Sequence, residues 1–400
     1  MWQKIKNIYH FFIAVFWNIL FLFPARRLKV IGVTGTDGKT TTVNLIYHIL
    51  KESGKRVSMV SSLGAVIGDK IYPIGFHVTT PQSFLLQKLF FKARRQGAKY
   101  FVLEVTSHSL DQERALGVPF EIGVITNLTS EHLDYHKTYD NYVKTKEKLL
   151  KKAKIAVVNK DDAAYQLLNQ AKSSKDPKDW VTYGFFEGSE INPENFDISN
   201  ANIFGEFNKY NVLAAVAACK SLGLSDEEIK KALLSFDLPK GRLDFVYRGE
   251  FGVMIDFAHT PNAFEQLLKS LRPIIRGKII HVFGSAGERD TLKRPYMGDI
   301  SASFADIVIL TTEDPRSEDV NKIIEQIESG IDNPKGKILK IVDRKQAITA
   351  AIGMAKKNDL VLITGKAAEN SMNLGNGEEP WDEYEVVRNI LSDLNLKVAI

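Results

Sequence analysis

The chain has 400 residues, of which 44% are hydrophobic and 25% charged, and its formal net charge is +5. This length predicts two or three domains, and the near-average composition excludes wholesale disorder, collagen and a polytopic membrane protein. Basic and acidic residues are interleaved instead of gathered into long runs, which argues against a nucleic-acid partner. The single cysteine, Cys219, excludes an internal disulfide, fits a reducing compartment, and is expected to lie buried in a helix.

The first predicted element is an apolar segment from Ile8 to Phe23, with Lys4 and Lys6 before it and Arg26 and Arg27 after it. It is shorter than the ~20 residues that cross a bilayer unaided. A cleaved signal peptide is one interpretation, but the segment FLFPARR offers no small-residue cleavage site. A second is a helix packed on the body of the protein or on a second copy. We favour the third, an in-plane or short spanning membrane helix with basic flanks near lipid head groups.

From Leu28 onward, short apolar runs alternate with helical stretches, which predicts a parallel sheet covered by helices. Helices are expected over residues 211–222 and 226–236, the second capped by Ser225. A turn-rich break then precedes a second series of strands and helices. We therefore predict an α/β protein in three parts: an apolar N-terminal helix over residues 1–27, membrane-associated or oligomerising; a central P-loop-type ATP-binding domain over residues 28–240; and a Rossmann-like domain over residues 241–400.

A glycine-rich loop, GTDGKTTT from Gly35 to Thr42, stands between an apolar strand and an apolar helix. Glycines let backbone N–H groups approach phosphate oxygens, and the helix N-terminus adds partial positive charge. Lys39 can neutralise the β- and γ-phosphates, and Thr40 can bind Mg²⁺. The sequence therefore predicts a nucleotide-phosphate site here.

Further candidate ligands follow the next strands. Glu104 ends the strand KYFVLEV, where the carboxyl ends of parallel strands face the ligand crevice, and a carboxylate there suits Mg²⁺. The segment NLTSEHLDYH, residues 127–136, is dense in possible ligands, although a histidine there is as often structural as metal-binding. The following YVKTKEKLL, residues 142–150, would ordinarily be interpreted as a solvated lysine-rich helix.

Taken together, these motifs resemble the Mur ligase family, and within it the MurE type, which adds the third amino acid of the peptidoglycan stem. The resemblance also rests on TTP at residues 79–81, EVTSHSLDQER at 104–114, GEFNKYN at 205–211, GRLD at 241–244, DFAHTPNAFE at 256–265, FGSAGERDTLKRPYMG at 283–298 and EDPR at 313–316. Enzymes of that type begin with a separate domain that holds the uridine nucleotide, and the apolar segment stands in its place here.

The resemblance implies a role for each matched position. Lys39 would hold phosphates, and Thr40 with Glu104 a first Mg²⁺. His132 would bind a second Mg²⁺ together with Lys146, which would carry a carbamate derived from CO₂, because an ammonium group would repel the metal. The other positions implied in ATP binding are Gly35, Thr36, Asp37, Gly38, Thr41, Asn208, Asn211, Arg242, Asp256 and His259.

Two further sets of positions match those that bind the acceptor and the amino acid. The acceptor set is Thr79, Thr80, Thr106, Gln112 and Arg114, and the amino-acid set is Asp314, Arg316, Gly365 and Glu369. Arg316 matches the arginine that binds the distal carboxylate of meso-diaminopimelate. Lys-Ala-Ala-Glu at residues 366–369 replaces the family's Lys-Gly-His-Glu, and Glu-Asp at 313–314 replaces Asp-Asn, which leaves the exact amino acid open.

The resemblance implies an ATP-dependent amide ligase of peptidoglycan biosynthesis that joins an amino acid to a muramyl-peptide-like acceptor, small or lipid-linked, through an acyl phosphate. A cytoplasmic location, at the inner face of the membrane, is expected. Two alternatives stay open: a ligase with a cyanophycin- or folate-type acceptor, and a non-catalytic, membrane-bound nucleotide sensor.

Overall fold

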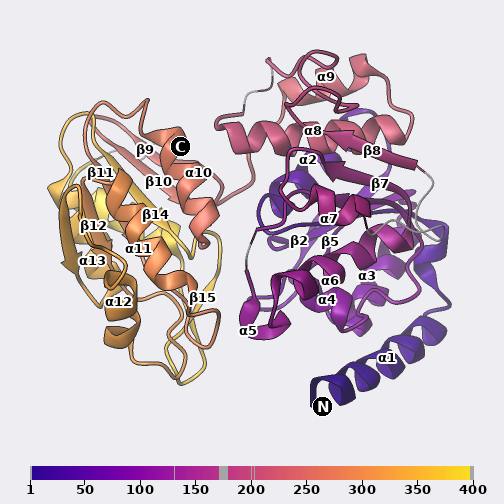
Figure 1. Cartoon of the computed structure of the whole chain (residues 1–400), viewed down its shortest axis with the longest axis horizontal. Coiled ribbons are helices and arrows are strands. Elements are labelled where there is room, and N and C mark those ends of the chain that lie inside the picture. The colour runs from indigo at the N-terminus through magenta and orange to yellow at the C-terminus, as the bar shows by residue number, and fades with distance from the viewer. Residues whose placement is uncertain (1, 130, 171–178, 200, 202, 397–400) are drawn as a thin grey trace. The chain divides into compact units, whose positions relative to one another are not determined.

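A computed structural model describes residues 2–129, 131–170, 179–199, 201 and 203–396. The chain divides into two compact units, residues 1–237 and 238–400, each built on a sheet covered by helices (Figure 1). The border falls in the turn-rich stretch that follows Phe236. The predicted α/β class is confirmed.

The N-terminal unit contains an eight-stranded sheet in the order β4-β3-β2-β5-β1-β6-β7-β8. Its strands are parallel except for β3 and β4, which form antiparallel pairs at one edge. The strands are β1 (Lys29–Thr34), β2 (Val57–Ser61), β3 (Gly64–Ile67), β4 (Lys70–Tyr72), β5 (Tyr100–Glu104), β6 (Phe120–Ile125), β7 (Ala153–Asn159) and β8 (Asp179–Tyr183). The helices are α1 (Trp2–Leu20), the 3₁₀ turn η1 (Pro24–Arg27), α2 (Lys39–Glu52), α3 (Ser83–Arg95), α4 (Ser107–Asp111), α5 (Leu133–His136), α6 (Tyr139–Lys152), α7 (Tyr165–Gln170), α8 (Glu206–Ser221) and α9 (Asp226–Leu234).

The central strand β1 pairs with β5 on one side and with β6 on the other. Five of its six residues are buried, as expected for a parallel strand covered on both faces. Because parallel strands end at the same edge, the segments after β1, β2, β5 and β6 meet there. This edge carries the glycine loop and Glu104.

Two predicted helices are found with shifted boundaries, and α9 ends at Leu234, two residues before the predicted end. Helix α9 begins with the expected Ser225 cap, and Ser225 and Glu228 form a capping box. Helix α8 begins at Glu206, five residues before the predicted start, because Gly205 supplies a left-handed backbone (φ +91°) at its N-cap. Cys219 is buried in α8, as predicted, and burial raises the pKa of its thiol.

The C-terminal unit contains a six-stranded sheet in the order β13-β12-β11-β14-β10-β9, in which only β9 is antiparallel to its neighbour, and a separate hairpin of β15 and β16. Its strands are β9 (Asp244–Arg248), β10 (Gly252–Asp256), β11 (Ile279–Phe283), β12 (Ile307–Leu310), β13 (Lys337–Lys340), β14 (Leu360–Thr364), β15 (Ser371–Asn373) and β16 (Glu378–Pro380). Its helices are α10 (Pro261–Leu271), α11 (Lys293–Phe304), α12 (Val320–Glu328), α13 (Arg344–Met354) and α14 (Glu383–Asp393).

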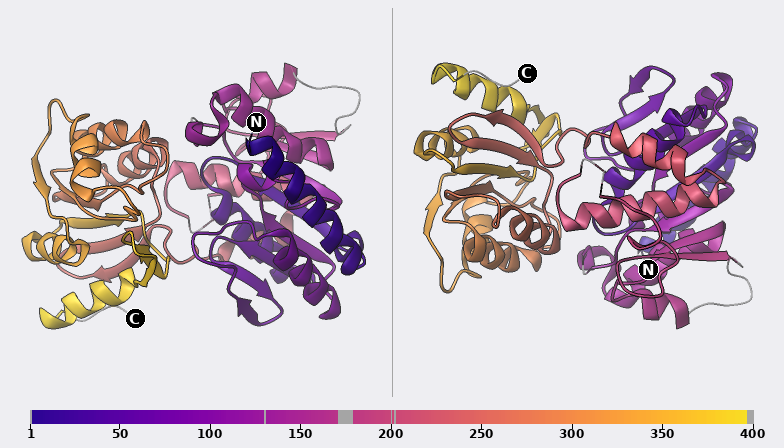
Figure 2. Two further views of the ribbon diagram at one scale, coloured as in Figure 1. Left: turned by 90° about the horizontal axis from the view of Figure 1, so that it is seen from below. Right: turned by 90° about the horizontal axis from the view of Figure 1, so that it is seen from above.

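The apolar N-terminal segment forms α1, which lies on the outside of the N-terminal unit beside α3 (Figures 1 and 2). Its contact with α3 is aromatic, with the ring centroids of Trp17 and Phe84 4.6 Å apart. Within the described part of the chain, no helix combines the length and the apolar character that crossing a membrane requires.

Candidate active site

The glycine loop joins β1 to α2 in a conformation that needs its glycines. Gly35 and Gly38 have φ angles of +152° and +79°. A Cβ atom at Gly35 would lie 1.8 Å from Oγ1 of Thr126, and one at Gly38 would lie 2.2 Å from Oδ1 of Asn211. Backbone and neighbouring side chains therefore approach too closely for any other residue.

The segment after β6 holds this loop in place. The Thr36 hydroxyl lies 2.8 Å from that of Tyr142, and the Asp37 N–H donates to Oδ1 of Asn127 at 2.9 Å. Nζ of Lys39 donates to the carbonyl of Thr36 at 2.7 Å, which keeps the ammonium group over the loop. Thr41, in the first turn of α2, is buried. The loop N–H groups and the N-terminus of α2 can thus bind phosphate oxygens beside a fixed positive charge.

Thr40 and Glu104 meet at this edge as the sequence predicts. Oγ1 of Thr40 lies 3.1 Å from both carboxylate oxygens of Glu104, and both side chains are buried. Ser62, which the sequence analysis missed, completes the group: its N–H donates to Glu104 at 2.9 Å and its hydroxyl lies 3.0 Å from that of Thr40. Its position directly after β2, the neighbour of β5, was the signal available. These oxygens are the hard donors that Mg²⁺ prefers, so the residues present fit a magnesium ion.

Lys146 is buried in α6, unlike the solvated lysine that its surroundings in the sequence suggest. Its amine donates to the carbonyl of Gly35 and lies 4.6 Å from the centre of the Tyr142 ring. Burial first, and the charge of Lys39 second, hold the pKa of this amine well below its usual range. A neutral amine is the form that reacts with CO₂, so the surroundings of Lys146 fit a carbamate.

His132 begins α5 in a left-handed conformation (φ +56°). Its Nε2 lies 3.7 Å from Oε2 of buried Glu131, and its ring centroid lies 4.9 Å from that of His108. The charge of Glu131 also acts on Lys146. An imidazole, a carboxylate and a buried amine therefore gather on the segments that follow β6.

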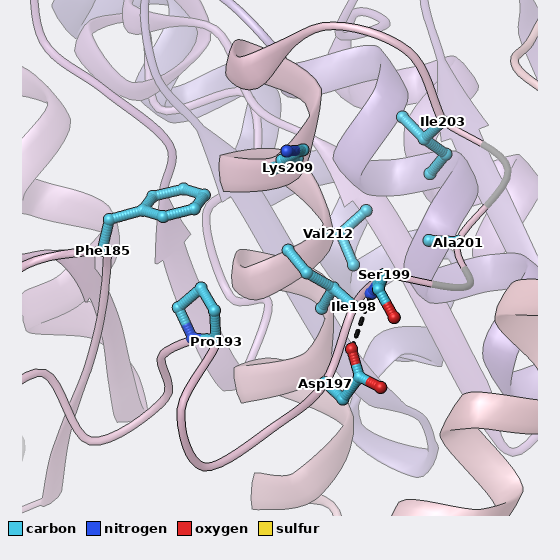
Figure 3. A pocket seen from close by; sticks show the side chains of 9 residues that line it. All are labelled: Phe185, Pro193, Asp197, Ile198, Ser199, Ala201, Ile203, Lys209 and Val212. Carbon is cyan, nitrogen blue, oxygen red and sulfur yellow. Dashed lines mark hydrogen bonds between the residues drawn. The ribbon is translucent and has the colours of Figure 1, made fainter.

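Asn208 and Asn211 face α2 from α8. Nδ2 of Asn211 donates to Oδ1 of Asn208 at 3.0 Å, and Oδ1 of Asn211 accepts from the hydroxyl of Thr42 at 3.3 Å. The adjacent flank of α8, at Lys209 and Val212, lines a cavity of about 370 Å³ that nothing in the sequence indicated (Figure 3). Phe185 and Pro193 line it as well.

The predicted acceptor positions form one hydrogen-bonded group, with half-buried Thr79 next to it in the chain. Oγ1 of Thr80 accepts from the N–H of Thr106 at 3.0 Å and donates to the carbonyl of Glu104 at 2.9 Å. Arg114 donates to the carbonyl of Thr80 at 2.8 Å and to Oε1 of Gln112 at 2.9 Å. The acceptor segment is thus tied directly to Glu104, the predicted Mg²⁺ ligand.

The C-terminal unit holds its own predicted residues at the end of β10. Asp256 accepts the N–H groups of Leu243 (2.8 Å) and Ala258 (2.7 Å). The guanidinium of Arg242 lies 4.5 Å from the centre of the Phe257 ring. Nδ1 of His259 lies 2.8 Å from the carbonyl oxygen of Phe257.

Two of the amino-acid positions, Asp314 and Glu369, contact buried Lys366, for which the sequence predicted no role. Nζ of Lys366 lies 2.9 Å from both oxygens of Asp314 and 2.7 Å from Oε2 of Glu369. Arg316 has a left-handed backbone (φ +52°) and donates to the carbonyl of Gly287 at 2.7 Å. Gly365 (φ +104°) lies against Glu313, since a Cβ there would be 2.6 Å from Oε2 of Glu313.

Comparisons with known proteins identify the family of the chain. Residues 33–219 match the Mur ligase middle domain, and residues 241–367 match the Mur ligase glutamate ligase domain. UDP-N-acetylmuramoyl-L-alanyl-D-glutamate--2,6-diaminopimelate ligase 1 of Clostridium acetobutylicum is 38% identical over 392 residues, which cover 93% of this chain and 80% of that protein.

Two solved structures have the same fold. A UDP-N-acetylmuramoyl-L-alanyl-D-glutamate--2,6-diaminopimelate ligase is 29% identical with a TM-score of 0.61, covering 92% of this chain and 79% of that one. Folylpolyglutamate synthase of Mycobacterium tuberculosis, at 16% identity, has a TM-score of 0.71 and covers 89% of this chain and 92% of that one. The chain belongs to the Mur ligase family of ATP-dependent amide ligases.

Proposed function

We propose that this ligase joins an amino acid to a carboxylate of a muramyl-peptide-like acceptor. The observation that carries the proposal is the meeting, at one sheet edge, of the glycine loop, the Thr40–Glu104 pair and the acceptor group around Thr80. The activity of the relative from Clostridium acetobutylicum, a muramyl-dipeptide–diaminopimelate ligase, supports this choice of acceptor.

The chemistry follows from these positions. An acceptor carboxylate oxygen attacks the γ-phosphorus of ATP, the bond to the ADP oxygen breaks, and an acyl phosphate forms. The amine of the amino acid then attacks the acyl carbon, and the tetrahedral intermediate expels phosphate to leave an amide. Lys39 and the N-terminus of α2 stabilise the charge on the transferring group. A Mg²⁺ ion held by Thr40 and Glu104 would supply further positive charge there.

Lys146 carries the second part of the proposal, as a carbamate that holds a second Mg²⁺ together with His132. Its burial against Gly35 and Tyr142 and its depressed pKa support this role. Lys146→Ala should lower ligation at least about a hundredfold, the scale of losing a metal-supporting group, and small added carboxylates should restore part of it.

The matched control is Lys151→Ala, since Lys151 lies in the same helix with its side chain 43% exposed and pairs only with Glu147 among the described contacts. After exchange in labelled bicarbonate, ¹³C NMR should show a carbamate resonance in the parent protein and in Lys151→Ala but not in Lys146→Ala. A Lys146→Ala protein as active as the parent would refute the metal-ligand role.

We expect the amino acid substrate to carry a second carboxylate that Arg316 binds, because a guanidinium group binds a carboxylate through two parallel hydrogen bonds. The preferred substrate is then meso-diaminopimelate. Arg316→Ala should remove ~2–4 kcal/mol of discrimination between diaminopimelate and lysine, the cost of a charged group left unpaired. Equal kcat/KM values for the two amino acids in the parent enzyme would contradict this specificity.

The working location is proposed to be the inner face of the cytoplasmic membrane, with lipid-linked acceptors included among the substrates. The supporting contact joins α1 to the acceptor segment: Nδ2 of Asn7 donates to Oδ2 of Asp111 at 2.8 Å. Asp111 directly precedes Gln112, one of the acceptor positions.

One experiment tests the substrates directly. Phosphate release is measured with ATP, Mg²⁺, a panel of acceptors and a panel of amino acids, and the products are identified by mass spectrometry. The panel contains a uridine-linked muramyl dipeptide, a lipid-linked muramyl peptide, a folate and an aspartate polymer. Ligation of only the folate or the aspartate polymer would overturn the proposed acceptor.

A further inference from the structure

Helix α1 turns an apolar face toward the outside of the N-terminal unit. Six of its side chains, each 55–65% exposed, recur at helical spacing along one side: Ile8, Tyr9, Phe12, Phe16, Ile19 and Leu20. Helices on the surface of a globular domain normally expose polar side chains and bury apolar ones. In α1 this arrangement is reversed, so we expect its outer face to bind an apolar partner that shields it from water.

Two polar residues of α1, Asn7 and Asn18, face the protein instead. Buried Asn18 donates through Nδ2 to the carbonyls of Ala14 (2.8 Å) and Leu116 (2.9 Å). Asn7 likewise donates a hydrogen bond through Nδ2 to Asp111 in the body of the protein. Aromatic contacts with α3, such as that between Trp17 and Phe84, complete this packed face. These bonds fix the rotation of the helix, so the apolar stripe cannot turn inward without breaking them.

The helix that carries the stripe and the two elements that follow or contact it are rich in basic residues. Helix α1 contains two lysines, η1 two arginines and α3 four basic residues, and none of the three contains an acidic residue. The whole chain has a net charge of only +5, so these three elements are more basic than the chain as a whole. Several of these cations sit beside aromatic rings: the Arg26 guanidinium is 4.1 Å from the centre of Phe23, and the Lys88 amine is 5.8 Å from that of Phe84.

We propose that this surface, the α1 stripe with Arg26, Arg27 and Lys88, binds an anionic lipid bilayer with α1 lying in the plane of the membrane. The stripe would enter the boundary between head groups and acyl chains, and the cations would contact the acidic head groups. A second copy of the chain fits less well, because two such faces would bring like charges together. The proposal concerns a binding surface and is independent of the acceptor that the ligase uses.

Sedimentation with vesicles tests this surface. The full chain is mixed with vesicles of equal parts phosphatidylcholine and phosphatidylglycerol, or of phosphatidylcholine alone, and the bound fraction is measured over a range of lipid and salt concentrations. We expect the chain to bind the anionic vesicles at least about tenfold more tightly than the neutral ones, and high salt to weaken this binding.

Two variants and their controls separate the apolar and charged contributions. The double variant Phe12→Ser/Phe16→Ser should bind at least about tenfold more weakly, because two exposed phenyl rings no longer enter the lipid. The affinity of the triple variant Arg26→Gln/Arg27→Gln/Lys88→Gln for anionic vesicles should fall about fivefold for each charge removed. Leu234→Ser and Lys269→Gln, exposed residues outside α1, η1 and α3, should bind as the parent does.

Three results would overturn the proposal: no binding of the parent chain to anionic vesicles, equal binding to both kinds of vesicle, or control variants that lose binding as much as the α1 variants. The mass of each protein in solution is measured without lipid. A parent dimer that Phe12→Ser/Phe16→Ser converts to a monomer, with no vesicle binding by either protein, would assign the face to a second copy instead. Because the triple variant changes only exposed side chains, it remains informative if the phenylalanine variant folds poorly.

Discussion

The amine of Lys366 lies 2.9 Å from both carboxylate oxygens of Asp314, in the interior of the C-terminal unit. The same amine also lies 2.7 Å from Glu369, whose side chain is 24% exposed. A buried ammonium group needs a compensating charge, and Asp314 is the more buried of the two carboxylates that supply it. Aspartate at residue 314, where the family motif has asparagine, therefore places a second carboxylate on Lys366, and Glu369 is the more exposed of the two carboxylates.

Asp314 and Glu369 should consequently differ in their mutational effects. Asp314→Ala should lower the free energy of unfolding by about 1–3 kcal/mol, because the buried Lys366 then keeps only the more exposed carboxylate. Glu369→Gln should leave the thermal midpoint nearly unchanged and raise the KM for the amino acid. Thermal unfolding and steady-state kinetics of both variants test this difference. A destabilised Glu369→Gln protein and a stable Asp314→Ala protein with a raised KM would contradict it.

Thr40 should control the dependence of activity on Mg²⁺. Thr40→Val keeps the shape of the side chain but removes the hydroxyl that lies 3.1 Å from Glu104, so the Mg²⁺ concentration for half-maximal activity should rise about tenfold or more. Thr40→Ser, which retains a hydroxyl, should stay close to the parent. A Mg²⁺ titration of the initial rate distinguishes them, and a parent-like valine variant would exclude Thr40 as a ligand.

His281 should make the protein less stable in acid. Burial lowers the pKa of His281 to about 3 from the ordinary 6.5, while its ring nitrogens lie 2.8 Å from the Ser301 hydroxyl and 3.0 Å from that of Thr364. As the pH falls below 6.5, the unfolded chain takes up a proton that the folded chain does not accept until about pH 3. The free energy of unfolding therefore falls by up to about 5 kcal/mol as the pH drops through this window. Above pH 6.5 His281 is neutral in both states, so it causes no loss of stability there.

The variant His281→Gln removes this titration and retains a polar side chain. Urea unfolding of both proteins between pH 7 and pH 4 should give a steeper loss of stability for the parent. Parallel curves would show that His281 does not contribute to acid sensitivity.

The buried pair of Arg344 and Glu383 should be necessary for the stability of the C-terminal unit. Arg344 donates to Glu383 through Nε at 2.9 Å and also to the carbonyls of Thr312 (3.1 Å) and Thr364 (2.8 Å). Arg344→Met should cost about 3–5 kcal/mol, because it leaves the Glu383 carboxylate buried without its cation. The double variant Arg344→Met/Glu383→Leu should recover much of that loss, as measured by urea unfolding. A double variant no more stable than the single one would show that the carbonyl bonds dominate.

The fold class and the nucleotide loop could be predicted from the sequence alone. Strand and helix periodicity, and the spacing of Gly35, Gly38 and Lys39 between them, are local properties, so they could be interpreted without knowledge of distant contacts. The position of Glu104 at a strand end also predicted its meeting with Thr40, because parallel strands end at one edge of the sheet.

Tertiary structure alone decided which charged groups are buried and which face of each helix is packed. The pattern KTKEK gave no sign that Lys146 would lie inside, against Gly35, since burial depends on residues far away in the chain. The pairing of Lys366 with Asp314 joins segments 52 residues apart. For α1, the apolar composition was evident, but the outward direction of its apolar stripe depends on tertiary contacts, among them the bonds of Asn7 and Asn18 to the body of the protein.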